Sequence, residues 1–263
     1  MARAALVISL VVPIVLAALS VAAQSEGNDE LLRSLKRDIE ALKDGQSRVQ
    51  RDLQDIKALL QRQGRASAAD EPQPQDIVLN VTDGQTKGDK GARGVLVDFT
   101  DYQCPFCARH VRETLPRIDT EYIKTGKLKY IVRDFPIESI HPRAFKAAEA
   151  AHCAGKQGKY WEMHDRLFAN QRKLAPSDLT AHAQAVALEA AQFQRCLDSG
   201  EHTGRIRKDM LEGQRAGVRG TPTFFLGVQE SNDPPLRVIR VIRGAQPFSV
   251  LKDAIDSVLD STK

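Results

Sequence analysis

The sequence of 263 residues lacks a concentrated block of basic side chains, and its formal net charge is only +4. Lysine and arginine are interleaved with aspartate and glutamate, whereas nucleic-acid-binding proteins gather basic residues on one face. Internal repeats are absent as well. We therefore expect no nucleic-acid partner. The content of 42% hydrophobic and 27% charged residues is typical of a globular protein.

Charge is also missing near the N-terminus, where Arg3 is the only charged side chain before Gln24. The uncharged run ends in Val21-Ala22-Ala23, the small-residue pattern of a signal cleavage site. We predict that residues 1–23 are a secretory signal peptide, with a retained membrane anchor as the alternative. Either segment would place the rest of the chain in an oxidising, extracytoplasmic compartment.

Cysteine is scarce, with four residues in the chain. Cys104 and Cys107 have the spacing of half a zinc site, but Cys153 and Cys196 are too far apart in sequence to supply the other half. His110 follows the pair, and we expect its side chain to be exposed on a helix. We therefore predict no metal and no other cofactor, and in an exported protein these cysteines favour disulfide chemistry.

A helical arm is predicted over residues 24–63. Apolar residues recur at two positions of a seven-residue repeat, as in a coiled coil, and Gln46 is the polar exception. These positions are Leu32, Leu35, Ile39, Leu42, Val49, Leu53, Ile56 and Leu60. We expect homo-oligomerisation through residues 28–63; an amphipathic helix lying on its own domain is the alternative. Residues 64–76 have the composition of a linker.

Residues 77–263 alternate strand and helix patterns, which indicates an α/β fold. One helix follows the cysteine pair, a long helical stretch runs from about 141 to 216, and a last helix covers 248–259. The expected strands are Ile77–Val81, Val95–Phe99, Leu128–Val132, 223–226 and 237–242, with a turn region at 83–94. This order predicts a thioredoxin-like fold with an inserted helical subdomain.

The reactive centre is predicted where a buried strand meets a helix. Pro105 suits the first turn of a helix, which places Cys104 at the helix N-terminus and Cys107 one turn further in. Free backbone N–H groups and the helix dipole there stabilise a thiolate. We expect Cys104 to exchange disulfides with substrates and the more buried Cys107 to resolve the mixed disulfide.

A second motif, Gly220-Thr221-Pro222-Thr223, precedes a late apolar strand. In this place it resembles the cis-proline loop of thioredoxin-like proteins, which faces the reactive disulfide and presents backbone groups to an extended substrate. An ordinary loop proline is the alternative. We assign substrate binding to Thr221 and Pro222, together with Pro105 and Phe106 beside the nucleophile.

Four stretches resemble the DsbA family of periplasmic oxidoreductases. They are residues 98–107 (DFTDYQCPFC), 151–161 (AHCAGKQGKYW), 164–168 (HDRLF) and 217–223 (GVRGTPT). The helical arm is similar to that of oligomeric members of the suppressor-of-copper-sensitivity type. One departure is Pro105-Phe106, because the best-known oxidases have Pro-His between the cysteines, and a histidine there helps to stabilise the thiolate.

The resemblance implies a periplasmic dithiol oxidase that acts on cysteine-containing exported proteins and is reoxidised by a membrane partner. It also implies a structural disulfide between Cys153 and Cys196, an even pair otherwise unassigned; two separate buried thiols are the alternative. Disulfide isomerisation or reduction is the alternative activity, and a copper-binding or chaperone module is a third. Asp98 and Asp101 flank the strand end, where each could be a proton relay, a helix cap or a surface group.

Overall fold

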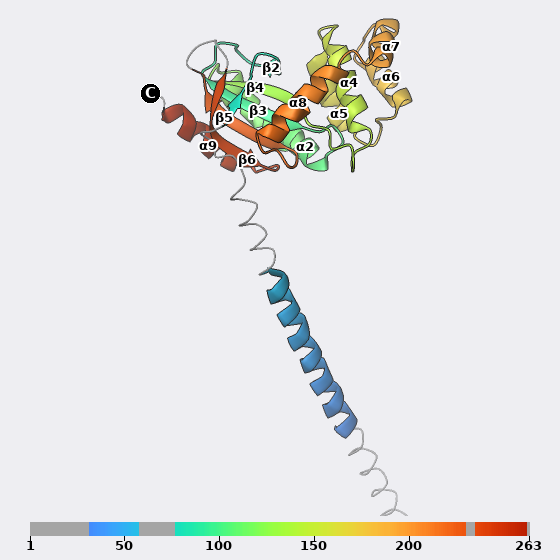
Figure 1. Cartoon of the computed structure of the whole chain (residues 1–263), viewed down its shortest axis with the longest axis vertical. Helices are drawn as coiled ribbons and strands as arrows, with labels where there is room; N and C mark the ends of the chain where they lie inside the picture. Colours follow the sequence, from blue (N-terminus) through green and yellow to red (C-terminus); the bar gives the residue numbers. More distant parts are fainter. Residues whose placement is uncertain (1–31, 58–76, 230–234, 262–263) are drawn as a thin grey trace, which may run out of the picture. The chain divides into compact units, whose positions relative to one another are not determined.

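The structure is a computed structural model that describes residues 32–57, 77–229 and 235–261 (Figure 1). The chain divides into two compact units, Met1–Asp70 and Glu71–Lys263. The predicted signal segment, the predicted linker and both ends of the predicted arm lie outside the described residues. None of the described helices is both long enough and apolar enough to cross a membrane.

In the first unit, residues 32–57 form one continuous helix. Its heptad side chains point into solvent along a single stripe, and each is between 45% and 73% exposed. These residues are Leu32, Leu35, Ile39, Leu42, Val49, Leu53 and Ile56. The sequence therefore predicted the helix correctly over this range, and its apolar stripe is exposed among the described residues.

The second unit is built on a six-stranded sheet with the order β1-β6-β5-β3-β4-β2. β3 and β4 are parallel, whereas β5 pairs antiparallel with β3, β6 with β5, β1 with β6 and β2 with β4. The strands are β1 Val78–Leu79, β2 Gln85–Lys87, β3 Gly94–Thr100, β4 Leu128–Asp134, β5 Thr223–Val228 and β6 Leu236–Arg243. The apolar runs predicted as buried strands form the centre of this sheet.

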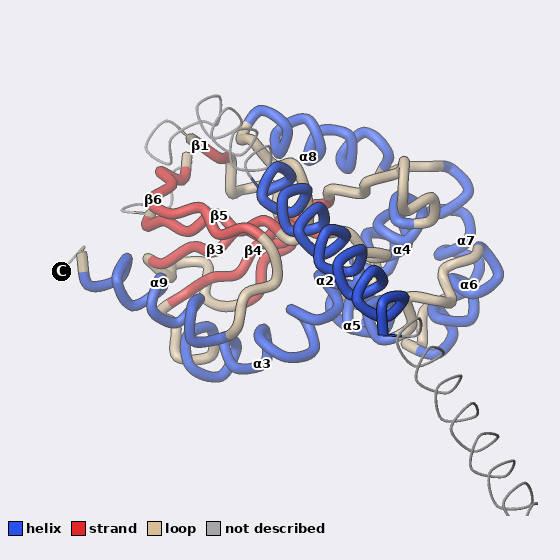
Figure 2. Tube along the Cα trace, turned by 90° about the horizontal axis from the view of Figure 1, so that it is seen from below, coloured by secondary structure: helices blue, strands red, loops and turns tan. Residues whose placement is uncertain are grey.

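Helices cover both faces of the sheet (Figure 2). Along β3, Leu96 belongs to one hydrophobic core, whereas Val95, Val97 and Phe99 belong to the other, because successive strand residues point to opposite faces. Figure 2 shows α8 (Thr203–Arg215) on one side of the sheet and α3 (Leu115–Ile118) and α9 (Phe248–Asp260) on the other.

The helix that follows β3 is a continuous stretch with two π-helical turns. Pro116 lacks an N–H group, so it interrupts the helical ladder close to the point where the first π turn ends. The parts of this stretch are α2 Pro105–Arg109, η2 His110–Thr114, α3 and η3 Asp119–Ile123.

An all-helical segment separates β4 from β5, as the sequence predicted. Its helices are α4 Ala144–Gly155, α5 Tyr160–Ala169, α6 Pro176–Ala185, α7 Ala190–Ser199 and α8. The predicted fold class, a thioredoxin-like α/β fold with a helical insertion, is thereby confirmed.

Two local predictions were inaccurate. The region 83–94 was predicted as a turn, but Gln85–Lys87 form β2, which pairs with β4 at the edge of the sheet. Three polar residues carry no apolar alternation, so the sequence offered no strand signal there. The first strand was predicted over Ile77–Val81, and only Val78–Leu79 are paired.

α8 approaches the sheet closely at Gly213. A Cβ atom added to Gly213 would lie 2.8 Å from the Phe135 ring and 2.9 Å from the Phe99 ring. Gly204, in the same helix, has no atom within 4 Å of its would-be Cβ. The absence of a side chain at Gly213 therefore lets the helix pack against the aromatic side chains of this core.

We predict that Gly213→Ala lowers the free energy of unfolding by about 1–3 kcal/mol, the typical cost of overpacking a core. Gly204→Ala is the matched control, which should leave stability unchanged or raise it slightly because alanine favours the helix. Urea unfolding of the two variants and the wild type provides the measurement. Equal stability of the two variants would contradict the tight contact at Gly213.

Candidate active site

Cys104 occupies the N-cap position of α2, immediately after the turn that leaves β3. Its backbone is extended (φ −71°, ψ 120°), no side chain caps the helix end, and Pro105 begins the first turn. The N–H groups of the first turn have no intrahelical acceptors, so they are available to a negatively charged sulfur. The placement is the one predicted from the sequence.

The two cysteines are free thiols with different surroundings. The pKa of Cys104 is lowered to about 6, because the Cys107 thiol and the backbone N–H groups of Cys107 and Phe106 stabilise its thiolate more than burial opposes it. Burial and the neighbouring Cys104 sulfur raise the pKa of Cys107 well above its ordinary value. Near neutral pH, Cys104 is therefore a thiolate and Cys107 a protonated thiol.

Asp98 lies on β3 and is buried behind the cysteine pair. Burial raises the pKa of its carboxyl group to about 7, against the effect of Tyr130, whose hydroxyl donates a 2.5 Å hydrogen bond to Asp98 Oδ2. The other carboxylate oxygen has no hydrogen-bond partner among the described residues. Because Asp98 is neither exposed nor at a helix end, the structure excludes the surface and capping roles for this residue.

His110 is buried, not exposed as the sequence suggested. Its ring lies against the Phe224 ring, with 4.5 Å between centroids, and the pKa of its imidazole is lowered to about 3 by burial. The side chain faces the sheet because the helix after Cys107 lies against it. The imidazole is therefore neutral at physiological pH.

The Thr221–Pro222 loop lies directly beside Cys104. The peptide bond between these residues is cis. In its protonated form the Cys104 thiol donates to the Thr221 carbonyl oxygen at 3.3 Å, and the Pro222 carbonyl accepts from Gly244 N at 2.8 Å. The structure thus brings together the two motifs that the sequence singled out.

The four residues assigned to substrate binding differ in accessibility. Phe106 is 54% exposed next to Cys104, with the Arg109 guanidinium 5.4 Å from its ring centroid. Pro105 is exposed too, whereas Thr221 and Pro222 are buried at their side chains. Contact of Thr221 and Pro222 with a substrate would therefore involve mainly their backbone.

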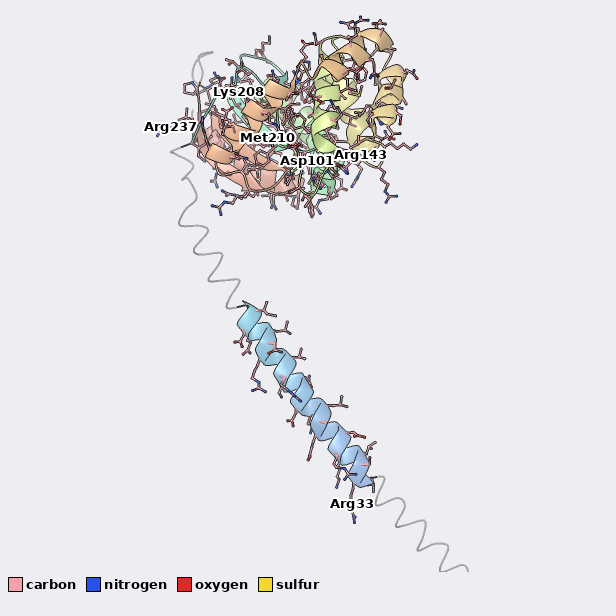
Figure 3. All side chains as sticks on the ribbon, turned by 45° about the vertical axis from the view of Figure 1, so that its right-hand side comes forward. Arg33, Asp101, Arg143, Lys208, Met210 and Arg237 are labelled. Atoms are coloured by element: carbon pink, nitrogen blue, oxygen red, sulfur yellow. A yellow bond between two sulfur atoms is a disulfide. The ribbon has the colours of Figure 1, made fainter. Side chains whose placement is uncertain are left out.

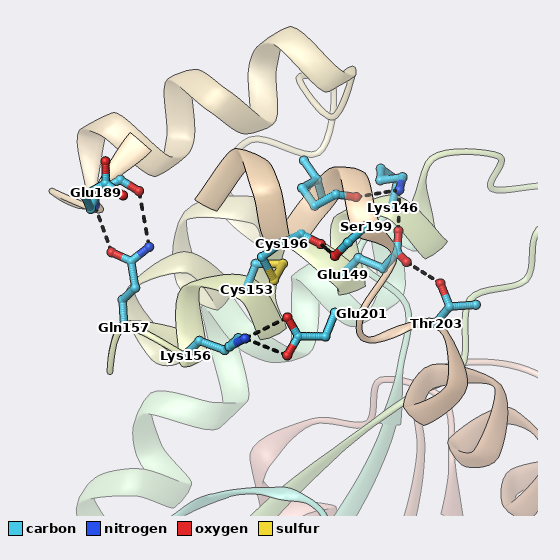
Figure 4. The surroundings of a disulfide bond; sticks show 11 residues. Lys146, Glu149, Cys153, Lys156, Gln157, Glu189, Cys196, Ser199, Glu201 and Thr203 are labelled. Atoms are coloured by element: carbon cyan, nitrogen blue, oxygen red, sulfur yellow. Dashed lines mark hydrogen bonds and ion pairs between the residues drawn. A yellow bond between two sulfur atoms is a disulfide. The ribbon is translucent and has the colours of Figure 1, made fainter. Parts of the chain in front are cut away.

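Cys153 on α4 and Cys196 on α7 form a disulfide, as the family resemblance implied (Figure 4). Around it, Lys156 forms an ion pair with Glu201, and Lys146 pairs with Glu149. His202 comes close enough to both sulfurs for metal-ligand spacing, and this is the one such grouping within the described ranges. The two sulfurs of this grouping are bonded to each other, so Cys153 and Cys196 form a covalent link between α4 and α7.

Sequence reasoning missed part of the support of the reactive turn. Gln171, from the loop after α5, donates to the carbonyl oxygens of Tyr102 at 2.9 Å and Cys104 at 2.8 Å. No motif signalled this role, because a lone glutamine in a loop carries no local pattern. The buried His164, paired with Asp165, and the stacked Tyr102 and Phe168 pack nearby.

Comparisons with known proteins agree with this geometry. A family model described as thioredoxin matches residues 80–236. Curated relatives include Na(+)/H(+) antiporter NhaA 3 of Salinispora tropica, 34% identical over 56% of this chain and 22% of that protein. NhaA 1 of Mycobacterium sp. (strain KMS) is 37% identical over 56% of this chain and 24% of that protein. The chain thus spans only about a quarter of these relatives.

Solved structures of similar fold are matched over most of their own length. Wolbachia pipientis α-DsbA1 has a TM-score of 0.60 at 24% identity, covering 70% of this chain and 94% of that one. BdbD of Bacillus subtilis has a TM-score of 0.61 at 21% identity, covering 70% and 97%. A thioredoxin-like oxidoreductase from Silicibacter pomeroyi has a TM-score of 0.56 at 27% identity, covering 67% and 92%.

We predict that the thiolate absorbance of the reduced protein titrates with a midpoint near pH 6, and that Cys104→Ser removes this step. An unfolded chain keeps the Cys104 proton up to its ordinary pKa of 9.0. Between about pH 6 and 9 the unfolded state therefore binds this proton and the folded state does not, so the stability of the reduced protein relative to the oxidised protein should rise with pH across this window, and this contribution is lost as pH falls through 6.

Ultraviolet absorbance against pH, with parallel urea unfolding of the reduced and oxidised forms, measures both effects. The oxidised form lacks the thiol and is the control. A midpoint that stays near the ordinary value for cysteine would contradict the thiolate stabilisation seen in the structure.

Proposed function

Because the chain belongs to the thioredoxin family and has the fold of DsbA-type thiol–disulfide oxidoreductases, we propose that it oxidises dithiols of exported proteins through a disulfide between Cys104 and Cys107. The observation that carries the proposal is the stabilised Cys104 thiolate at the N-terminus of α2. A reduced form stabilised in this way makes the corresponding disulfide a stronger oxidant.

The proposed reaction begins with the oxidised centre. A substrate thiolate attacks Cys104 Sγ, the Cys104–Cys107 bond breaks, and Cys107 leaves as a thiolate that takes up a proton. A second substrate thiolate then attacks the substrate sulfur of the mixed disulfide and releases Cys104 as a thiolate. The substrate loses two electrons, the centre gains them, and the low pKa of Cys104 favours this last departure.

Asp98 is the group best placed to donate a proton to Cys107 and to accept one from it. The Cys107 thiol holds its proton strongly, whereas the pKa of the Asp98 carboxyl is near 7, so Asp98 exists in both protonation states close to neutral pH. We assign it proton donation to the leaving Cys107 thiolate and proton acceptance during reoxidation. Of the alternatives open at the sequence level, burial favours this proton-relay role.

The proposed setting is the periplasm or an equivalent extracytoplasmic compartment, with a membrane redox partner to restore the disulfide. The disulfide between Cys153 and Cys196 supports an oxidising environment, because structural disulfides persist there and are rare in the cytosol. The exposed Phe106 beside Cys104 supports a substrate that brings an apolar side chain next to its cysteine.

We predict that Cys104→Ser abolishes dithiol oxidation, whereas Cys107→Ser accumulates mixed disulfides with substrate through Cys104. The reason is the difference in thiolate stability and access between the two sulfurs. Non-reducing gel electrophoresis and mass spectrometry after incubation with a dithiol peptide provide the measurement. Substrate captured equally well through Cys107 in the Cys104→Ser protein would reverse the assignment.

The reduction potential of the pair separates oxidase from reductase. A value of about −120 mV would place the centre with strong oxidants, and one of about −270 mV with reductants, on the scale of the superfamily. We expect a reduction potential closer to about −120 mV than to about −270 mV, as for an oxidase. The lack of a histidine between the cysteines, where Phe106 stands, makes the measurement informative.

We also propose that the helix at residues 32–57 associates with copies of itself in parallel. Beside the apolar stripe, Asp38 and Asp52 lie along one edge, and Lys43 and Lys57 along the other. In a parallel, in-register coiled coil Asp38 lies next to Lys43 of the adjacent copy, and Asp52 next to Lys57. An antiparallel pair would place like charges together, so charge favours the parallel arrangement.

We predict that the double variant Asp38→Lys/Asp52→Lys weakens self-association by about tenfold or more at low salt, because it places like charges in contact. Mixing it with Lys43→Asp/Lys57→Asp should restore association between the two variants. Light scattering and native mass spectrometry of the full chain report both effects. A monomeric wild-type protein, or variants that associate as the wild type does, would contradict the parallel coiled coil.

A further inference from the structure

Asp101 lies in the turn between β3 and α2, and its side chain is fully buried. Oδ1 accepts hydrogen bonds from the backbone N–H groups of Gln103 at 2.7 Å and Cys104 at 3.1 Å. Oδ2 accepts from Ile137 N at 2.8 Å and from His141 Nδ1 at 2.9 Å. One carboxylate therefore binds both the nucleophile's own amide and the segment that leads from β4 into the helical insertion.

A buried carboxylate is costly unless its oxygens are satisfied, and each oxygen of Asp101 has two donors. A neighbouring contact strengthens the same junction, because Gln103 Oε1 accepts from Arg143 N at 2.8 Å. Figure 3 shows Asp101 and Arg143 where the sheet meets the inserted helices. On this side, the reactive turn is thus attached to the insertion by the side chains of Asp101 and Gln103, which bind backbone N–H groups and the His141 imidazole.

The turn is also held from the loop that follows α5. Gln171 donates to the carbonyls of Tyr102 and Cys104, as described above. Asp101 accepts hydrogen bonds from the N–H groups of the turn, and Gln171 donates hydrogen bonds to its carbonyl groups. The backbone at Cys104 therefore has little freedom to rotate. Both residues contact backbone atoms of Cys104, and neither contact depends on its sulfur.

We propose that Asp101 is a positioning residue, which holds Cys104 over the free N–H groups of α2 by joining the reactive turn to the insertion. This role deepens the proposed dithiol oxidation, on which it rests. The sulfur gains its stabilisation from the Cys107 thiol and from the N–H groups of Phe106 and Cys107, and these directional contacts require a fixed Cys104 backbone.

The charge of Asp101 would act in the opposite direction. A carboxylate near Cys104 disfavours the thiolate, as does Asp98 beneath the pair, so removing the charge alone should lower the pKa of the thiol. Loss of positioning should raise it. The sign of the change therefore distinguishes a positioning role from a merely electrostatic one, and a purely structural role would change stability without moving the thiolate titration.

The test is the thiolate titration of the reduced full-length protein. We expect Asp101→Ala to raise the midpoint by about one pH unit, a tenfold loss of thiolate at a given pH below it. Asp101→Asn keeps an oxygen for the Gln103 and Cys104 amides and should lie closer to the wild type. A midpoint that is unchanged or lowered in Asp101→Ala would overturn the proposal.

Asp89→Ala is the matched control, because Asp89 Oδ1 accepts from Gly91 N at 2.8 Å in a similar but exposed turn. Its midpoint should equal that of the wild type. Should Asp101→Ala fail to fold, His141→Ala removes a single donor, and a smaller rise is expected. His141→Asn supplies a side-chain N–H donor and should restore the midpoint; no restoration would overturn the proposal.

The titration also separates this proposal from the proposed function. A wild-type protein that fails to oxidise a dithiol peptide would refute the oxidase, whatever the Asp101 variants do. A wild-type oxidase whose Asp101→Ala variant keeps both its rate and its midpoint would refute the positioning role alone.

Discussion

Cys104 Sγ lies 3.3 Å from the carbonyl oxygen of Thr221, 117 positions away in sequence, and the site depends on this approach of the two motifs. It is possible because β3 and β5 pair antiparallel with Phe99 opposite Thr223, which brings the end of one strand to the start of the other. All the inserted helices lie between these strands in sequence. The sheet register, not the length of the insertion, therefore determines where the two motifs meet.

The two cysteines lie close together, but differences in their surroundings shift the pKa values of their thiols in opposite directions. Cys104 lies at the N-terminus of α2, where amide groups and a neighbouring thiol favour its charge. Cys107, one turn further along the same helix, is buried and close to the carboxyl group of Asp98. The residues are one helical turn apart, yet the pKa of one thiol is lowered and that of the other is raised. This difference gives the disulfide a direction of attack and supports its proposed role as an oxidant.

The insertion contributes to the site by supporting it. At the end of β4, the buried Arg133 forms an ion pair with Asp209 of α8, and Asp134 pairs with His152 of α4 at 2.5 Å. Burying these polar and charged groups is tolerable because each has a close partner, and losing one partner would leave the other unpaired. Together with the Asp101 contacts and the disulfide between α4 and α7, these pairs hold the insertion against the strand that adjoins the reactive turn.

The sequence by itself determined the cysteine pair at a helix start, the proline loop, the helical insertion and the heptad helix, because periodicity, capping and spacing are local properties. It did not reveal β2, whose three polar residues become a strand only by pairing with β4. It misplaced His110, because only packing against Phe224 decides which side of the helix is buried. The hydrogen-bond partners of Asp98, Asp101 and Gln171 were decided by tertiary structure alone, since only the folded chain brings these partners within hydrogen-bonding distance.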